Sequence, residues 1–295
     1  MLIINTKGGL GNQMYQNALY LTMKQAGKDV KLCTEHFDWA SAETNNIIAS
    51  HGRKYLIEDI FTTEAVKATS REIRNLSTAG MDFVSRALRK VGLIKKTHLF
   101  EEKMNYPSIE QLMDLDNAFL DGYWQRFDYY KTSERYIRES YVFSRELTGR
   151  NKEISKKIKD ENSVSIHVRR NDYLGSSLYV IQNSDYYSKA IALASELLQK
   201  PVFYCFSDDI NWCRDNLFPM GYNVLFVDWN SGKDSYCDMQ LMSQCKANIV
   251  TNSSFSMWAA WLNSFENKII VRPSHYYTDK DLDEHFFWPE NWLTV

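Results

Sequence analysis

Hydrophobic residues in the second half of the chain come in short runs that alternate with amphipathic segments. Apolar residues at every second position of 164–168 predict a buried strand. Further strands are expected within 202–209, 223–229, 247–254 and 268–273. The intervening segments 185–199, 211–218, 235–245 and 255–263 have helical patterns. Strict alternation of strand and helix predicts a parallel sheet covered on both faces.

The first half shows a weaker version of the same pattern. Residues 2–5 form an apolar run, and a glycine turn then leads into a helix within 7–30. A second strand is expected in 30–39 and a further one at the start of 119–130, whereas 43–115 is polar and helical, without a strong strand. The densely charged segment 150–163 separates the halves. We therefore expect an α/β protein with two Rossmann-like domains facing a cleft, 1–158 and 159–295, whose last helix could pack back on the first domain.

Composition is that of a soluble globular protein, with 44% hydrophobic and 24% charged residues. A net charge of −2 argues against nucleic acid as a partner, so an anion site would have to be local. The five cysteines lack metal-ligand spacing and indicate reduced, buried thiols. The chain begins without a signal-peptide pattern and has no apolar run long enough to span a bilayer, so we expect a cytoplasmic protein.

Two adjacent arginines follow the strand at 163–168, in the stretch SVSIHVRRNDYLG. Ligands of open α/β sheets bind at the carboxyl ends of strands, and guanidinium groups pair well with phosphate oxygens. Arg169 and Arg170 therefore predict a diphosphate site that needs no metal. Strand alternation leaves an alternative, in which only one arginine faces the cleft while the other pairs with a helix carboxylate.

Other motifs have both a structural and a functional interpretation. The glycine turn GGLGNQ at 8–13 and the helix start TNSSFS at 251–256 could each bind an anion or could simply be a tight turn and a helix cap. FSDD at 206–209 is interpreted as a helix cap, and the acidic stretches 114–116 and 279–284 as solvated surface rather than metal sites. The basic amphipathic segment 83–96 is most often a solvated face, but it could contact an anionic membrane.

Three motifs in order, GGLGNQMYQNALY, SIHVRRNDY and TNSSFSMWAAWL, resemble those of the bacterial α-1,2-fucosyltransferases of glycosyltransferase family 11. FDW at 37–39, GYWQ at 122–125 and KIIVRP near the end are also family-like, so the resemblance spans essentially the whole chain. It implies a GT-B-like fold and an inverting, metal-independent transfer of L-fucose from GDP-L-fucose to the 2-hydroxyl of a terminal galactoside. Domain 1–158 would lie on the acceptor side, and 159–295 would bind the donor. GDP-L-fucose would be a co-substrate, with no cofactor.

The resemblance also implies roles for individual residues. Arg169 would be catalytic, as would Asp172 in an undefined role. The donor would be bound by Gly11, Asn12, His167, Arg169, Arg170, Asp238, Asn252, Ser253, Ser254 and Phe255. The acceptor would be bound by Asp38, Trp39, Tyr123 and Trp124. The base stays open among Asp172, Glu35, Asp38, Asp121 and the departing phosphate, because Leu174 to Ser177 stand where α-1,6 relatives carry a glutamate.

Related activities and other classes of protein remain as alternatives. Another GDP-sugar glycosyltransferase of the same fold, with a different acceptor or linkage, is the nearest one, and a protein O-fucosyltransferase is a specific case. A noncatalytic nucleotide-binding scaffold and an NAD-dependent oxidoreductase are further alternatives, the last suggested by GGLGN and Asp38. The expected role is synthesis of O-antigen or another surface polysaccharide. The β-galactoside acceptor could be lipid-linked, with at most peripheral contact at the inner face of the membrane.

Overall fold

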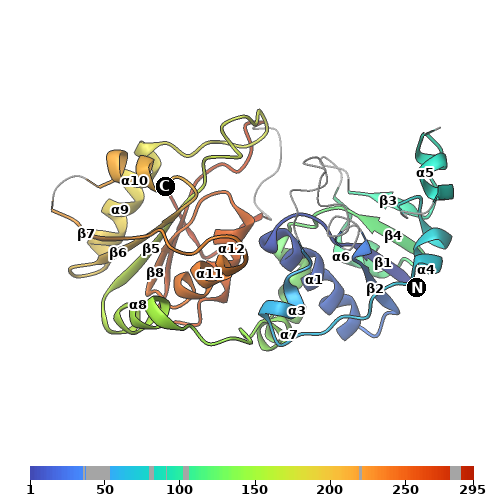
Figure 1. Ribbon diagram of the computed structural model, residues 1–295, viewed down its shortest axis with the longest axis horizontal. Helices are drawn as coiled ribbons and strands as arrows, with labels where there is room; N and C mark the ends of the chain where they lie inside the picture. Colours follow the sequence, from blue (N-terminus) through green and yellow to red (C-terminus); the bar gives the residue numbers. More distant parts are fainter. Residues whose placement is uncertain are drawn as a thin grey trace. The chain divides into compact units, whose positions relative to one another are not determined.

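The computed structural model describes residues 1–35, 37, 54–79, 83–90, 92–101, 106–218, 221–279 and 287–295. The chain divides into two compact units, Met1–Ser144 and Arg145–Val295 (Figure 1). The predicted boundary at 158/159 lies inside a helix of the second unit, α8 (Gly149–Asp160). The charges of this segment occupy the exposed face of α8, while Ile154 and Ile158 are buried. Density of charge therefore marks an amphipathic helix here and not a linker.

Unit 1 is built on a four-stranded parallel sheet of order β2-β1-β4-β3. Its strands are β1 (Leu2–Asn5), β2 (Val30–Cys33), β3 (His98–Phe100) and β4 (Ala118–Asp121). Its helices are α1 (Leu10–Gln25), α3 (Ile57–Ile60), α4 (Ser70–Leu76), α5 (Phe83–Lys90), α6 (Ile109–Met113), the 3-10 helix η2 (Phe127–Ser133) and α7 (Glu134–Ser140). Strand β3 lies in the segment expected to lack strands. It has three residues, too few for a periodic pattern.

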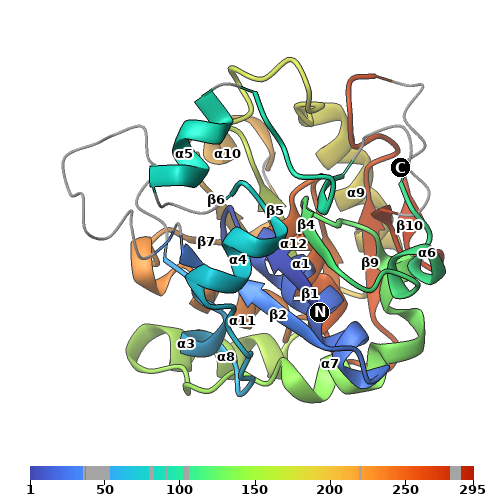
Figure 2. The same cartoon turned by 90° about the vertical axis from the view of Figure 1, so that its right-hand side faces the viewer.

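Unit 2 contains a six-stranded parallel sheet of order β10-β9-β8-β5-β6-β7 (Figure 2). Its strands are β5 (Ser163–Val168), β6 (Val202–Ser207), β7 (Asn223–Val227), β8 (Ala247–Ile249), β9 (Ile269–Arg272) and β10 (Leu293–Thr294). Its other helices are α9 (Ser184–Leu197), α10 (Ile210–Asn216), η3 (Gly232–Asp234), α11 (Tyr236–Met242) and α12 (Ser254–Leu262). Every strand predicted in this half is present. Only the short β10 was not expected.

The core of unit 2 explains which way the side chains of β5 point. Val164, Ile166 and Val168 are buried against α9 and α10, and they share one core cluster with Phe203 and Cys205 of β6. On the opposite face, Asn248 donates hydrogen bonds to the Ser165 hydroxyl of β5 and to the Met242 carbonyl of α11. The period of two therefore assigns even positions of β5 to α9 and α10, and odd positions to α11 and α12.

The cysteine side chains and the helices can each be compared with the sequence-based expectations. All five cysteines are free and buried. Among the helices within the described ranges, none combines the length and the apolar character needed to cross a bilayer. The last α-helix of these ranges, α12, packs against α11 of its own unit.

Candidate functional site

The two predicted arginines extend the alternation of β5 and so point to opposite faces of the sheet. Arg170 is on the α10 side, where its guanidinium lies 3.9 Å from the centre of the Trp212 ring and its Nε is 3.3 Å from a carboxylate oxygen of Asp209. Its side chain is only 15% exposed. Arg169 is on the other side and is 31% exposed. The opposite orientations that strand alternation predicts are therefore observed, but both arginines have acidic partners, Asp209 for Arg170 and Asp172 and Asp208 for Arg169.

Three carboxylates at the ends of β5 and β6 fix the arginine loop. Asp172 accepts two hydrogen bonds of 2.7 Å from Arg169, one from Nε and one from a terminal nitrogen. Asp208 lies 3.3 Å from Arg169 and also accepts the backbone N–H groups of Arg170 and Asn171. Asp209 caps α10, as predicted, by accepting from the Trp212 N–H. A guanidinium carries five N–H donors, so Arg169 keeps at least two for a ligand.

His167 lies two residues before Arg169 and therefore on the same face of the sheet. Its ring is buried, 5.5 Å from the Phe255 ring of α12, and its Nδ1 has no hydrogen-bond partner among the described residues. Burial and the nearby Arg169 cation lower the pKa of His167 to about 3. The imidazole is therefore neutral at ordinary pH and offers an unsatisfied polar atom beside the arginine.

The loop before α12 is fixed by side chains that the sequence assigned to the donor. Asn252 is buried, and its amide donates to the carbonyls of Val180 and Tyr276, while its backbone carbonyl accepts from the Tyr173 hydroxyl. Ser253 is the N-cap residue, but within the described chain its side chain makes no capping hydrogen bond. Ser254 and Phe255 begin the helix. Asn252 thus has a structural task, and its contact with a donor stays a prediction.

Asp238 on α11 is a half-buried carboxylate with one amide partner. It accepts a hydrogen bond of 2.7 Å from Asn230, which also contacts Asn151, and Asn151 in turn accepts from the Trp229 indole. Burial raises the pKa of Asp238 to about 7, although the Asn230 hydrogen bond opposes this change. Further N–H donors, such as those of a nucleobase, would stabilise the ionised form of this carboxylate.

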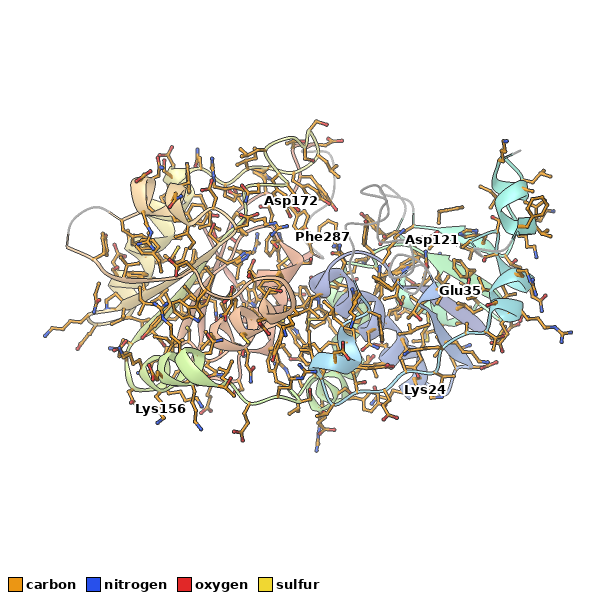
Figure 3. The ribbon with its side chains drawn as sticks, in the orientation of Figure 1. Lys24, Glu35, Asp121, Lys156, Asp172 and Phe287 are labelled. Carbon is orange, nitrogen blue, oxygen red and sulfur yellow. The ribbon has the colours of Figure 1, made fainter. Side chains whose placement is uncertain are left out.

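Charged groups also collect at the carboxyl edge of the sheet in unit 1. Asp121, at the end of β4, accepts hydrogen bonds from Lys7, Asn5 and His98, at 2.6, 3.0 and 3.1 Å. Burial opposes ionisation, yet these partners hold the pKa of Asp121 below its usual value. Figure 3 shows Asp121 in this unit and Asp172 in the other. Lys7 also lies 5.0 Å from the centre of the Tyr123 ring.

Glu101, directly after β3, shapes the loop that carries the predicted acceptor aromatics. Its carboxylate accepts the backbone N–H groups of Tyr123 and Trp124 at 2.6 and 2.9 Å. A Cβ at Gly122 would lie 2.5 Å from the Glu101 Cβ, so only glycine fits there. Trp124 has a φ of 55° and is 1% exposed, whereas Tyr123 is 41% exposed. Tyr123 therefore offers a ring face to a ligand, and Trp124 packs in the core of its unit.

The glycine turn is followed directly by α1, and the predicted Gly11 and Asn12 lie in the first turn of this helix. Gly8 has a φ of 83°, and a Cβ there would lie 2.6 Å from the Asn12 amide nitrogen. Asn12 accepts a hydrogen bond from Gln125, and so it joins α1 to the aromatic loop. The two remaining acceptor predictions, Asp38 and Trp39, lie outside the described residues.

Sequence analysis missed Lys7, His98 and Glu101 as members of this edge. Each lies in or just after a strand, which is a usable signal, but β3 was not recognised. In the described ranges, no group of three His, Cys, Asp or Glu side chains could hold a metal ion.

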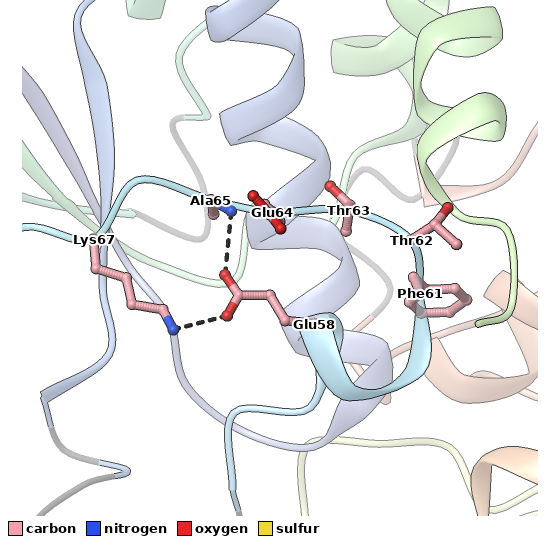
Figure 4. A pocket seen from close by; sticks show the side chains of 7 residues that line it. All are labelled: Glu58, Phe61, Thr62, Thr63, Glu64, Ala65 and Lys67. Carbon is pink, nitrogen blue, oxygen red and sulfur yellow. Dashed lines mark hydrogen bonds and ion pairs between the residues drawn. The ribbon is translucent and has the colours of Figure 1, made fainter. Parts of the chain in front are cut away.

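A cavity of about 470 Å³ in unit 1 contains none of the predicted site residues (Figure 4). It is lined by Glu58, Phe61, Thr62, Thr63, Glu64, Ala65 and Lys67. Glu58 accepts hydrogen bonds from the Lys67 ammonium at 2.8 Å and from the Ala65 N–H at 3.1 Å. Its main charges thus neutralise each other, and the cavity adds nothing to the candidate site.

Comparison with known proteins identifies relatives that match nearly the whole chain. An Escherichia coli alpha-1,2-colitosyltransferase is 27% identical over 100% of this chain and 99% of its own length. The Escherichia coli O-antigen biosynthesis glycosyltransferase WbnK is 30% identical over 92% of this chain and 93% of its own length. The crystal structure of fucosyltransferase NodZ from Bradyrhizobium aligns with a TM-score of 0.50 at 14% identity, covering 88% of this chain and 91% of that one.

The predicted α/β fold of GT-B-like type is confirmed by the two parallel sheets and by the NodZ alignment, which shows the fold alone. The sequence profile described as Glycosyl transferase family 11 matches residues 87–295, a range that includes the arginine pair, Asp238 and α12. A glycosyltransferase binds a nucleotide sugar and a glycan acceptor. Unit 2 carries a half-buried guanidinium, Arg169, and unit 1 separately carries an exposed aromatic ring, Tyr123. The chain belongs to glycosyltransferase family 11.

Proposed function

We propose that this protein transfers L-fucose from GDP-L-fucose to the 2-hydroxyl of a terminal β-galactoside, with inversion and without a metal ion. Membership of family 11 supports glycosyl transfer, and the name of the alpha-1,2-colitosyltransferase relative supports the linkage. The observation that carries the proposal is Arg169, which two carboxylates orient and which keeps free N–H donors at the end of β5.

The leaving diphosphate would be stabilised at Arg169. As the bond between the fucose anomeric carbon and the β-phosphate oxygen breaks, negative charge grows on that phosphate. A guanidinium already held in place stabilises this charge without reorganising. Arg170, stacked on Trp212 and paired with Asp209, positions the loop and contributes its charge. The neutral His167 and the first turn of α12 supply further polar atoms on the Arg169 face.

The guanine base would bind at Asp238. Guanine presents two neighbouring N–H groups, and an ionised carboxylate can accept both. The half-buried Asp238 has one side-chain partner, Asn230, so it has capacity for these donors. Asn230 is in turn held by Asn151, which accepts from the Trp229 indole.

The acceptor hydroxyl attacks the anomeric carbon, the carbon–oxygen bond to GDP breaks, and GDP leaves with the electron pair. Two of the candidate bases are already engaged, since Asp172 pairs with Arg169 through both oxygens and Asp121 pairs with Lys7 and His98. We assign the hydroxyl proton to the departing diphosphate, with Glu35 and Asp38 as the alternative bases, of which Asp38 lies outside the described residues. Asp172 is then a positioning residue for Arg169. Tyr123 is the acceptor platform, held by Glu101.

The test is release of GDP from GDP-L-fucose, with lactose as acceptor and EDTA present. We expect release that depends on the acceptor, survives EDTA and collapses in Arg169→Ala. Thermal unfolding with GDP and with NAD separates the classes, because a bound ligand raises the melting temperature. A rise in melting temperature with NAD but not with GDP would refute GDP-L-fucose as the donor. Loss of turnover in the presence of EDTA would refute metal independence.

A second candidate is transfer of a different activated sugar or formation of a different linkage by the same fold. The relative that spans the whole chain is named a colitosyltransferase, which favours testing nucleotide-activated colitose beside GDP-L-fucose. If kcat/KM is higher with activated colitose than with GDP-L-fucose, colitose replaces fucose as the transferred sugar in the proposal. Linkage analysis of the product distinguishes the 2-hydroxyl from other positions.

A further inference from the structure

The helix α5 and the turn after it place large apolar side chains in solvent. Phe83 is 85% exposed, Val84 59%, Leu93 60% and Ile94 55%. For comparison, Phe265, an exposed phenylalanine elsewhere in the chain, is 44% exposed. Phe83, Val84, Ala87 and Leu88 fall on one side of an α-helix, because residues three and four apart are neighbours. We call Phe83, Val84, Leu93 and Ile94 the α5 surface.

Helix α5, which begins with Phe83 and Val84, lies at the periphery of unit 1 in the same region as α4 (Figures 1 and 2). The chain after α5 is attached to α4, since the Lys95 ammonium donates to the carbonyls of Arg74 and Asn75 and the Thr97 hydroxyl donates to Leu76. The exposed apolar side chains are thus presented from a segment tied to the unit.

Basic residues surround the apolar ones. Residues 83–96 contain five Lys or Arg and no Asp or Glu, while the whole chain has a net charge of −2, so the rest of the chain carries −7 (−2 − 5). Lys90 and Lys96 are exposed, as are Arg71 and Arg74 on α4. Positive charge is therefore concentrated where the apolar side chains are exposed.

We propose that the α5 surface docks this protein on an anionic lipid bilayer, with Phe83, Val84, Leu93 and Ile94 entering the headgroup region and the exposed Lys90 and Lys96 facing the acidic headgroups. Interfacial helices combine these two features, an inserted apolar face and basic flanks. Each basic side chain near an anionic surface is worth about fivefold in binding. Binding to a second copy is disfavoured, because a two-fold contact would place this positive surface against itself.

The test is sedimentation of the full-length chain with vesicles, without substrate, so its outcome does not depend on the proposed transfer. Vesicles of phosphatidylcholine with phosphatidylglycerol should bind the chain, and vesicles of phosphatidylcholine alone should bind much less. Raising the salt from about 0.1 M to 1 M should weaken binding, since the screening length falls from about 10 Å to 3 Å. Phe83→Glu and Leu93→Glu should each lower vesicle binding roughly tenfold.

The matched control is Phe265→Glu, which changes an exposed phenylalanine of unit 2 in the same way. It should bind vesicles like the wild type, and all three variants should keep the wild-type melting temperature. Absence of binding, equal binding to both kinds of vesicle, or equal loss in Phe265→Glu would overturn the proposal. So would a dimer that Phe83→Glu separates into monomers, because the surface would then be covered by a second copy.

Discussion

Charged side chains lie at the carboxyl edges of both sheets, but the two edges differ in how these charges are paired and how far they are exposed. In unit 2 the charge that remains available is a cation, Arg169, which is 31% exposed and held from one side by Asp172 and Asp208. In unit 1 the central charge is an anion, Asp121, which is 13% exposed and accepts from Lys7, Asn5 and His98. An exposed, oriented guanidinium can accept an anionic ligand. A buried carboxylate with three donors instead supports its neighbours.

The largest effect is expected for Arg169→Ala. Removing a preorganised donor from a developing oxyanion typically costs about 10²–10³ in kcat. Arg170→Ala should cost less, about tenfold, because the Arg170 guanidinium is stacked on Trp212 and paired with Asp209. The measurement is GDP release at saturating donor and acceptor.

Arg214→Ala serves as the control for the arginine variants, since Arg214 forms a half-exposed pair with Asp228. It should retain wild-type turnover. Equal losses in the Arg169 and Arg170 variants would show that both guanidiniums reach the diphosphate, and the distinction drawn from strand alternation would then be wrong.

Removal of the anion in unit 1 should act on stability. Asp121→Asn leaves the Lys7 ammonium without its carboxylate, and loss of this partly buried, charge-assisted hydrogen bond costs about 2 kcal/mol in unfolding free energy. The pKa of Asp121 is lowered in the folded protein, so the unfolded state binds more protons as the pH falls below about 4. Its stabilising contribution is therefore present at neutral pH and is lost in acid.

Urea unfolding of Asp121→Asn and wild type at pH 7 and near pH 3 measures this difference. The gap between them should be large at pH 7 and should narrow at the lower pH. Asp29→Asn is the control, because Asp29 is 69% exposed. A gap that stays constant with pH would mean that the Asp121 charge does not stabilise unit 1.

The next largest effect concerns Asp238 and the pH dependence of guanosine binding. Burial raises its pKa to about 7, and N–H donors from guanine would favour the ionised form. Guanosine binding should therefore release a proton and weaken about tenfold per pH unit below about 7. Guanosine is used because it lacks phosphates that titrate in this range. Calorimetry should show the slope in wild type and in Asp215→Asn, and a flat profile in Asp238→Asn. A slope that persists in Asp238→Asn would place guanine elsewhere.

How far sequence predicted the structure differs between the units for a physical reason. In unit 2 the strands β5 and β6 each span six residues with apolar runs. The periodicity of the sequence was therefore enough to predict both strands and the carboxyl edge of their sheet. In unit 1 the strand β3 spans three residues, and Glu101 just after it was overlooked with it.

Pairing across strands was also beyond the sequence. Strand alternation predicts that Arg169 and Arg170 point to opposite faces of the sheet. It does not say which of the two faces binds a ligand. In the structure Arg170 contacts the Trp212 ring and the Asp209 carboxylate, which belong to a different element from the arginines, and our proposal therefore places the ligand at Arg169. Tyr123 and Trp124 present the same difficulty, since the exposure of two adjacent aromatics depends on Glu101, which is 22 residues away from Tyr123.

Tyr123 therefore provides the smallest and most specific test of unit 1. Its ring is 41% exposed with the Lys7 ammonium 5.0 Å from the ring centre, so it can stack on a sugar while Lys7 binds a hydroxyl. Tyr123→Ala should raise the acceptor KM about fivefold, equivalent to about 1 kcal/mol for an aromatic contact, with the donor KM unchanged. Tyr123→Phe should restore the acceptor KM, because the ring makes the contact. Tyr222→Ala, at a similarly exposed tyrosine of unit 2, should change neither constant. A rise in the donor KM of Tyr123→Ala would assign this edge to the nucleotide sugar, and the contrast between an anion-binding edge and an acceptor-binding edge would fail.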